Sequence, residues 1–177
     1  MKLNAKQLRK GTGYSGQVTA KKQEIYIVLD NVLDTYNIGS IFRLADAVAA
    51  KKVYLCGQTE TPPNHRIKKA SINTTEWVTW TYKETAMQAV HELKTKKSKV
   101  KIVAIEQGNK SVPYDKFEYT LPICLIVGNE TTGVSKEVLE IADAIVELPM
   151  FGVNISLNVM VCLGIVLYEV IERNPQV

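Results

Sequence analysis

Residues 123–168 read ICLIVGNETTGVSKEVLEIADAIVELPMFGVNISLNVMVCLGIVLY, and this stretch decides how the chain is organised. It contains two apolar runs of strand length, 123–127 and 144–148, and each run leads into a polar loop and then into a segment of helical period. Loops that follow parallel strands emerge at the carboxyl edge of a sheet, where open α/β sheets bind ligands. The stretch therefore predicts a ligand site made by loops 128–133 and 148–158.

An earlier part of the chain repeats this design. Residues 25–29 are a nearly continuous apolar run, as in a parallel sheet covered on both faces. A loop up to Gly39 and a helix over 40–50 are expected to follow. Arg43 falls opposite the apolar stripe of that helix, so we expect it to point away from the core and towards the loop edge.

The remaining segments complete an α/β pattern. Six strands are expected, at 25–29, 53–56, 77–82, 100–106, 123–127 and 144–148, with helices at 40–50, 84–97, from about 135, and at 156–172. This order predicts a mostly parallel sheet of about six strands with helices on both faces. The last helix is apolar nearly all round, so we expect it to be buried in the core or against a second copy of the chain.

Charge is distributed unevenly along the 177 residues. Residues 1–22 hold six of the 22 basic side chains and no acidic one, which leaves 16 basic and 18 acidic residues in the remainder. We therefore divide the chain into a basic arm, 1–22, and a domain, 23–177. A basic arm suits a polyanion, although a solvated terminus is the alternative. The arm contains a G-x-G-x-x-G pattern at 11–16, but no strand precedes it, so it predicts a hinge and not a dinucleotide site.

A second basic segment, 61–69, starts with paired prolines and is expected to be a loop, either an RNA clamp or a solvated connection. No apolar run has the length of a membrane span or resembles a signal peptide, so we expect a cytoplasmic protein without membrane contact. The three cysteines, Cys56, Cys124 and Cys162, lie far apart in apolar segments. This spacing predicts buried thiols and no metal site.

Three motifs, taken together, resemble those of the SpoU/TrmH family of RNA ribose 2′-O-methyltransferases. They are Asn37-x-Gly39 with Arg43, Gly128-Asn129-Glu130-x-x-Gly133, and Leu148-Pro149-Met150 followed by Ser156-Leu157-Asn158-Val159. The resemblance covers roughly residues 24–172. Three motifs in one order and spacing are far more specific than any one of them.

The resemblance implies a fold, a cofactor and partners. Family members form a deep trefoil knot with the carboxyl-terminal part of the chain, and they dimerise through helices that include the last one. The implied cofactor is S-adenosylmethionine (SAM), and the implied substrate is transfer or ribosomal RNA, with transfer RNA slightly favoured. The residues that the resemblance places in the cofactor site are Ile105, Val127, Gly128, Asn129, Gly133, Leu148, Met150, Ser156 and Leu157.

The resemblance also implies a catalytic set, which consists of Arg43, Asn37, Glu130, Ser156 and Asn158. The matching arginine of the family has been proposed as a general base, but a guanidinium keeps its proton at neutral pH. We therefore expect Arg43 to grip the neighbouring phosphate and to stabilise the developing alkoxide while phosphate or water takes the proton. The other members are expected to orient these groups, and Ser156 is also a candidate helix cap.

Two features leave alternatives open. Met160 and Cys162 depart from the Ser-x-Ala that many relatives carry after the third motif, which puts the packing or the dimer contact in doubt. A catalytically inactive RNA-binding or ribosome-assembly protein could share the fold. A flavodoxin-like nucleotide-binding domain is a third possibility, and the lack of a glycine-rich phosphate loop after the first strand counts against it.

Overall fold

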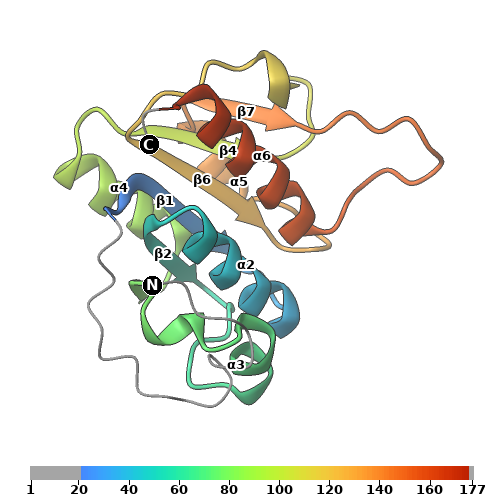
Figure 1. The fold of residues 1–177 in the computed structure, drawn as a ribbon. Coiled ribbons are helices and arrows are strands. Elements are labelled where there is room, and N and C mark those ends of the chain that lie inside the picture. Colours follow the sequence, from blue (N-terminus) through green and yellow to red (C-terminus); the bar gives the residue numbers. More distant parts are fainter. Residues whose placement is uncertain (1–20, 176–177) are drawn as a thin grey trace.

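The computed structural model describes residues 21–175 (Figure 1). The glycine pattern at 11–16 and all of the basic arm except Lys21 and Lys22 lie outside these residues, so the role of the arm stays a prediction.

A single parallel sheet forms the centre of the described chain. Its seven strands lie in the order β3-β2-β1-β6-β4-β7-β5, and every pairing between them is parallel. The strands are β1 (Gln23–Asp30), β2 (Ala50–Cys56), β3 (Trp80–Lys83), β4 (Lys101–Ile105), β5 (Val112–Pro113), β6 (Ile123–Gly128) and β7 (Ala144–Glu147). The predicted α/β class is confirmed, and the additional strand is the two-residue β5.

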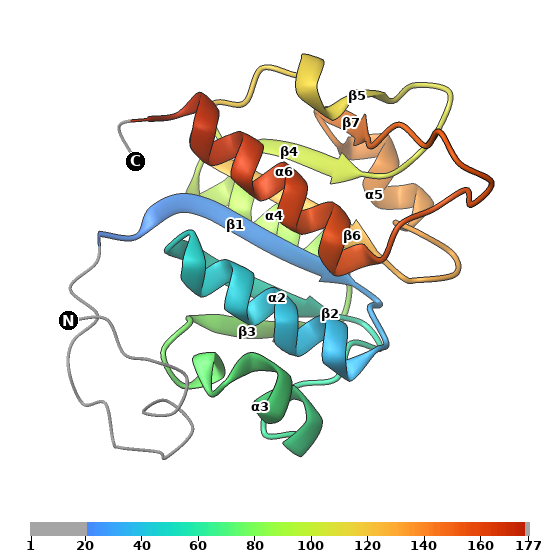
Figure 2. The same cartoon turned by 45° about the vertical axis from the view of Figure 1, so that its right-hand side comes forward.

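Helices cover both faces of this sheet, as Figures 1 and 2 show. They are α2 (Thr35–Ala47), α3 (His65–Ser71), α4 (Ala86–Lys96), α5 (Lys136–Ile141) and α6 (Val159–Arg173), with short 3-10 turns at Thr74–Glu76 and Tyr114–Lys116. Alternate residues of β1 serve the two faces. Ile27 packs in the core that α2, α3 and α6 cover, whereas Val28 packs in the core that α4 and α5 cover.

Two helix starts differ from the expectations because side-chain caps decide them. Helix α2 begins at Thr35, five residues early, since Asp34 accepts from the Tyr36 and Asn37 amides. The first motif is therefore helical and not part of a loop. Helix α6 begins at Val159 and is capped by Asn158 rather than Ser156. In each case a side-chain oxygen satisfies an amide that the first helical turn leaves unpaired.

The predicted loop at 61–69 is also partly helical. Asn64 caps α3 by accepting from the amides of Arg66 and Ile67, at 2.9 and 3.2 Å. Helix α3 then packs directly on α2 at Gly39, where an added Cβ would lie 2.6 Å from the Ala70 Cβ and 2.7 Å from the Ile67 carbonyl oxygen. Gly39 thus permits a close approach of two helices, so the basic segment is held against α2 and is not a mobile clamp.

Helix α6 has one face in the core and one face uncovered in the single chain. Leu163, Val166, Leu167 and Val170 are buried, whereas Val161, Ile165 and Tyr168 are exposed. The loop before it, residues 148–158, projects from the body of the molecule (Figures 1 and 2) and exposes Phe151, Val153 and Ile155. Within residues 21–175, no helix is both long enough and apolar enough to cross a membrane.

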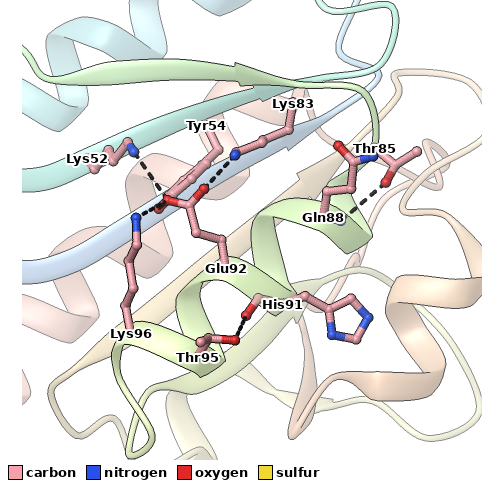
Figure 3. Close-up of polar contacts among 9 residues, drawn as sticks. All are labelled: Lys52, Tyr54, Lys83, Thr85, Gln88, His91, Glu92, Thr95 and Lys96. Carbon is pink, nitrogen blue, oxygen red and sulfur yellow. Dashed lines mark hydrogen bonds and ion pairs between the residues drawn. The ribbon is translucent and has the colours of Figure 1, made fainter.

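An ion-pair cluster ties α4 to the two strands beneath it (Figure 3). Glu92 of α4 pairs with Lys52 of β2, with Lys83 of β3 and with Lys96 of its own helix. The Tyr54 hydroxyl donates a further hydrogen bond to the Glu92 carboxylate at 3.3 Å. The cluster lies on the face of the sheet opposite to α2 and α6, so it contributes to the scaffold and not to the site described next.

Candidate functional site

A cavity of about 480 Å³ opens at the carboxyl edge of the sheet. The ends of β4, β6 and β7 form its floor, and the loop before α6 forms a wall. All nine residues that were expected to bind the cofactor line this cavity, namely Ile105, Val127, Gly128, Asn129, Gly133, Leu148, Met150, Ser156 and Leu157. The structure therefore brings the predicted set together, and its binding role stays a prediction.

The loop after β6 folds back on itself at the cavity floor. The Asn129 amide donates to the Gly133 carbonyl oxygen at 3.0 Å, and the Gly133 amide donates in return at 2.9 Å. This turn brings Gly128 so close to Gly133 that an added Cβ at residue 128 would overlap the Gly133 carbonyl carbon. Gly133 itself has φ +71°, which favours glycine. Both glycines are consequently required for the closed form of this loop, which lines the cavity.

Side chains from neighbouring strand ends hold this loop in place. Asn129 donates to the Asn31 carbonyl oxygen at 2.9 Å. Asp30, at the end of β1, accepts from the Ser135 amide at 2.9 Å. Glu106, which follows β4, accepts from the Val134 amide at 2.9 Å and also lines the cavity. The sequence reasoning missed Glu106, although a carboxylate directly after a buried strand at this edge was a usable signal.

A chain of polar contacts joins the three sequence motifs beside the cavity. Glu130 accepts from the Asn37 side-chain amide at 3.0 Å and from the amides of Leu33 and Asp34 at 3.1 Å each. Asn37, which is buried in the first turn of α2, accepts in turn from the Asn158 side-chain amide at 2.9 Å. Glu130, Asn37 and Asn158 thus form one connected unit.

This unit favours an ionised Glu130. Partial burial by itself would raise the pKa of the carboxyl, but the hydrogen bonds from Asn37 and from the Leu33 and Asp34 amides outweigh it, and the pKa of Glu130 is lowered. Glu130 therefore serves as an acceptor that fixes the start of α2 and the Asn37 side chain at neutral pH.

Two predicted catalytic residues stand apart from this unit. Ser156 lines the cavity and is exposed. Arg43 is exposed on α2 and is not among the residues that line the cavity. Arg43 makes no side-chain hydrogen bond or ion pair with any residue of 21–175. Its orientation away from the core agrees with the sequence reasoning, whereas its catalytic role stays a prediction.

The electrostatics of the cavity favour a cation. Three carboxylates line it, Glu106, Glu130 and Glu147, and no Lys, Arg or His among the described residues does so. Cys162 lines it as well and is only partly buried, unlike Cys56 and Cys124, which are buried as expected. Apolar side chains such as Leu148 and Leu157 line the cavity beside these carboxylates, which suits a flat heterocycle attached to a positively charged group. These features fit SAM, whose adenine ring is apolar on its faces and whose sulfonium is permanently charged.

Comparison with known proteins assigns these motifs to one family. The family model described as the SpoU rRNA Methylase family matches residues 24–168. The tRNA (guanosine(18)-2'-O)-methyltransferase of Aquifex aeolicus is 38% identical over 160 residues, which are 86% of this chain and 72% of that protein. The Escherichia coli protein of the same name is 30% identical over 157 residues, which are 86% of this chain and 66% of that protein.

Solved structures agree with the sequence comparison. The A. aeolicus TrmH/SpoU tRNA modifying enzyme superposes with a TM-score of 0.80 at 32% identity, and the match covers 97% of this chain and 83% of that one. The AdoMet-bound rRNA methyltransferase from Sinorhizobium meliloti gives a TM-score of 0.78 at 28% identity, covering 93% of this chain and 59% of that one.

Proposed function

The chain belongs to the SpoU rRNA Methylase family, and from this membership we infer that it transfers the methyl group of SAM to a ribose 2′-hydroxyl of RNA. The observation that carries the inference is the connected unit of Glu130, Asn37 and Asn158 beside the cavity. A flavodoxin-like nucleotide-binding domain is excluded by the same membership.

The substrate within this class is transfer RNA. Several similar proteins are named tRNA (guanosine(18)-2'-O)-methyltransferases, including the relatives from A. aeolicus and E. coli, and this supports a guanosine of transfer RNA over ribosomal RNA. A cytoplasmic location, where such RNA is available, is part of the same proposal.

SAM, when bound, supplies an electrophilic methyl group, and the residues of the chain provide position and charge. The loop at Gly128 and the apolar side chains of Leu148 and Leu157 hold the adenosyl part, while the cavity carboxylates favour the cationic sulfonium. Asn37 and Asn158 fix the loop before α6 to the start of α2, which keeps this pocket in shape.

Arg43 acts on the RNA and not on the cofactor. It is exposed and has no ion-pair partner within residues 21–175, so it is available to a phosphate next to the target ribose. A guanidinium binds a phosphate bidentately and stays charged, which stabilises an alkoxide that forms nearby while phosphate or water accepts the proton.

The protein works as a homodimer in this proposal. Val161, Ile165 and Tyr168 form an exposed apolar stripe on α6 that nothing in the described chain covers. A stripe of this kind on a carboxyl-terminal helix suits a second copy of the same helix.

Two measurements test the proposed activity. Calorimetry is expected to show SAM binding to the wild-type protein, and transfer of labelled methyl groups to unfractionated tRNA is expected to yield nucleotides resistant to alkaline cleavage at the methylated ribose. Arg43→Ala is expected to keep SAM affinity and to lose methyl transfer by about 100-fold or more. SAM and RNA binding without any methyl transfer by the wild type would favour the inactive RNA-binding alternative. Equal transfer by wild type and Arg43→Ala would remove Arg43 from the mechanism.

A further inference from the structure

The described chain carries two groups of basic side chains that differ in how many of their members have a carboxylate partner. The first group lies on the α4 face and includes the three lysines around Glu92 (Figure 3). On the same side, Glu24 pairs with Lys51 and Lys97. Each of these five lysines therefore has a carboxylate partner, although two carboxylates leave the group with a net positive charge.

The second group lies on α3, and only one of its three members has a carboxylate partner. Arg66, Lys68 and Lys69 are all exposed in a single turn of helix. Lys68 pairs with Glu76 at 3.5 Å. The side chains of Arg66 and Lys69 have no hydrogen bond or ion pair with any residue of the described part of the chain. Two of the three charges are therefore free.

The position of α3 is fixed relative to Arg43. The contact of Gly39 with the Ala70 methyl group and with the Ile67 carbonyl oxygen holds α3 close against α2. Arg43 follows Gly39 by four residues, which places it about 40° around the same side of α2 and about 6 Å further along the helix. Figure 2 shows α3 beside α2. Arg43 consequently lies on the side of α2 that faces α3.

We propose that Arg66 and Lys69 of α3, together with Arg43, form a phosphate-binding surface for the RNA strand that flanks the target nucleotide. This inference rests on the proposed function, because it takes Arg43 as the group that meets the phosphate beside the target ribose. The phosphate beside the target ribose then contacts Arg43, and the next phosphates of the same RNA strand contact α3. Rigid presentation favours this role, since α3 is already ordered and loses little conformational freedom when RNA binds.

The test compares two lysines that are both exposed and both lack an ion pair within residues 21–175. Lys69→Glu changes α3, whereas Lys99→Glu changes the turn before β4 by the same amount of charge. Binding of unfractionated tRNA to the purified protein is measured between 50 and 300 mM KCl. Lys69→Glu is expected to lower affinity on the order of tenfold near 0.1 M salt and to reduce the slope of log K against log salt by about 1, while Lys99→Glu stays within about twofold.

Two further measurements separate this surface from folding and from the proposed activity. Lys69→Arg keeps the charge and is expected to keep wild-type affinity, and calorimetry with SAM is expected to give the same affinity for every variant. Equal tRNA affinity and equal salt slope for Lys69→Glu and Lys99→Glu would overturn the α3 surface even if the wild type methylates RNA. A wild type that binds SAM but neither binds nor methylates tRNA would instead overturn the proposed substrate.

Discussion

The side-chain oxygen of Asn37 accepts a hydrogen bond from the side-chain amide of Asn158 at 2.9 Å, across 121 residues of sequence. The amide of Asn37 donates at the same time to Glu130. Because Asn37 is buried, both partners lose a hydrogen bond that water cannot easily replace when this residue is removed.

Asn37→Ala is therefore expected to lower the free energy of unfolding by about 1–3 kcal/mol and to weaken SAM binding. Urea unfolding and calorimetry measure the two effects. Asn154→Ala removes an exposed asparagine of the loop before α6 and is expected to change stability by less than about 0.5 kcal/mol. Equal stability of the two variants would contradict the bridging role.

Gly128→Ala is expected to abolish SAM binding, since the added methyl group would overlap the backbone of Gly133 and open the loop at the cavity floor. The matched control is Gly108→Ala, where an added Cβ has no atom within 4 Å. Calorimetry with SAM and a thermal unfolding scan check both variants. Wild-type SAM affinity in Gly128→Ala would show that the loop after β6 can adopt another backbone conformation and still bind SAM.

Val161→Glu is expected to convert the protein from dimer to monomer, because it places a charge in the apolar stripe on α6. Val112 in β5 offers a close control, since both valines are 39% exposed. Sedimentation velocity is expected to show a dimer for wild type and Val112→Glu, and a monomer for Val161→Glu. A monomeric wild type would remove the dimer from the proposal.

Acid is expected to weaken the contact between α4 and the sheet through Glu92. Hydrogen bonds from Lys83 and Lys96 are the main causes that lower the pKa of Glu92 from 4.5 to about 2, and Lys52 adds to them. Because the pKa of Glu92 is lower in the folded state than in the unfolded state, the ionised carboxylate stabilises the fold at pH values above the unfolded pKa. This contribution to the free energy of unfolding disappears as the pH falls from 4.5 to about 2.

Glu92→Gln should consequently reduce the free energy of unfolding at pH 7 by about 3 kcal/mol at most. The deficit relative to wild type should shrink as the pH approaches 2. Urea unfolding at pH 7, 4.5 and 3 measures this difference in stability. The control is Glu137→Gln, because Glu137 is exposed and has no ion pair within the described chain. A deficit that does not change with pH would assign the loss to packing.

The sequence predicted the parts of this structure that depend on local periodicity. Strands β1 and β6 are continuous apolar runs because they are buried on both faces, so their existence and the binding edge beyond them followed directly. Periodicity does not report side-chain caps. The start of α2 at Thr35 and the whole of α3 depend on Asp34 and Asn64, which is why both were predicted as loop.

Contacts between distant segments could not be derived from one sequence. The motifs placed Asn37, Glu130 and Asn158 at one edge, but only the folded chain shows that Asn37 lies between the other two. Glu106 was missed for the same reason, since its bond to the Val134 amide joins two loops 28 residues apart. The trefoil knot stays a prediction.

The contact at Gly39 limits how this site could be transplanted. A design that copied only the three motif loops onto another sheet would leave out α3. Position 39 must nevertheless be glycine only because it lies against the Ala70 methyl group and the Ile67 carbonyl oxygen of that helix. A designer would have to carry the second helix along with the first, although α3 contributes no residue to the cavity lining.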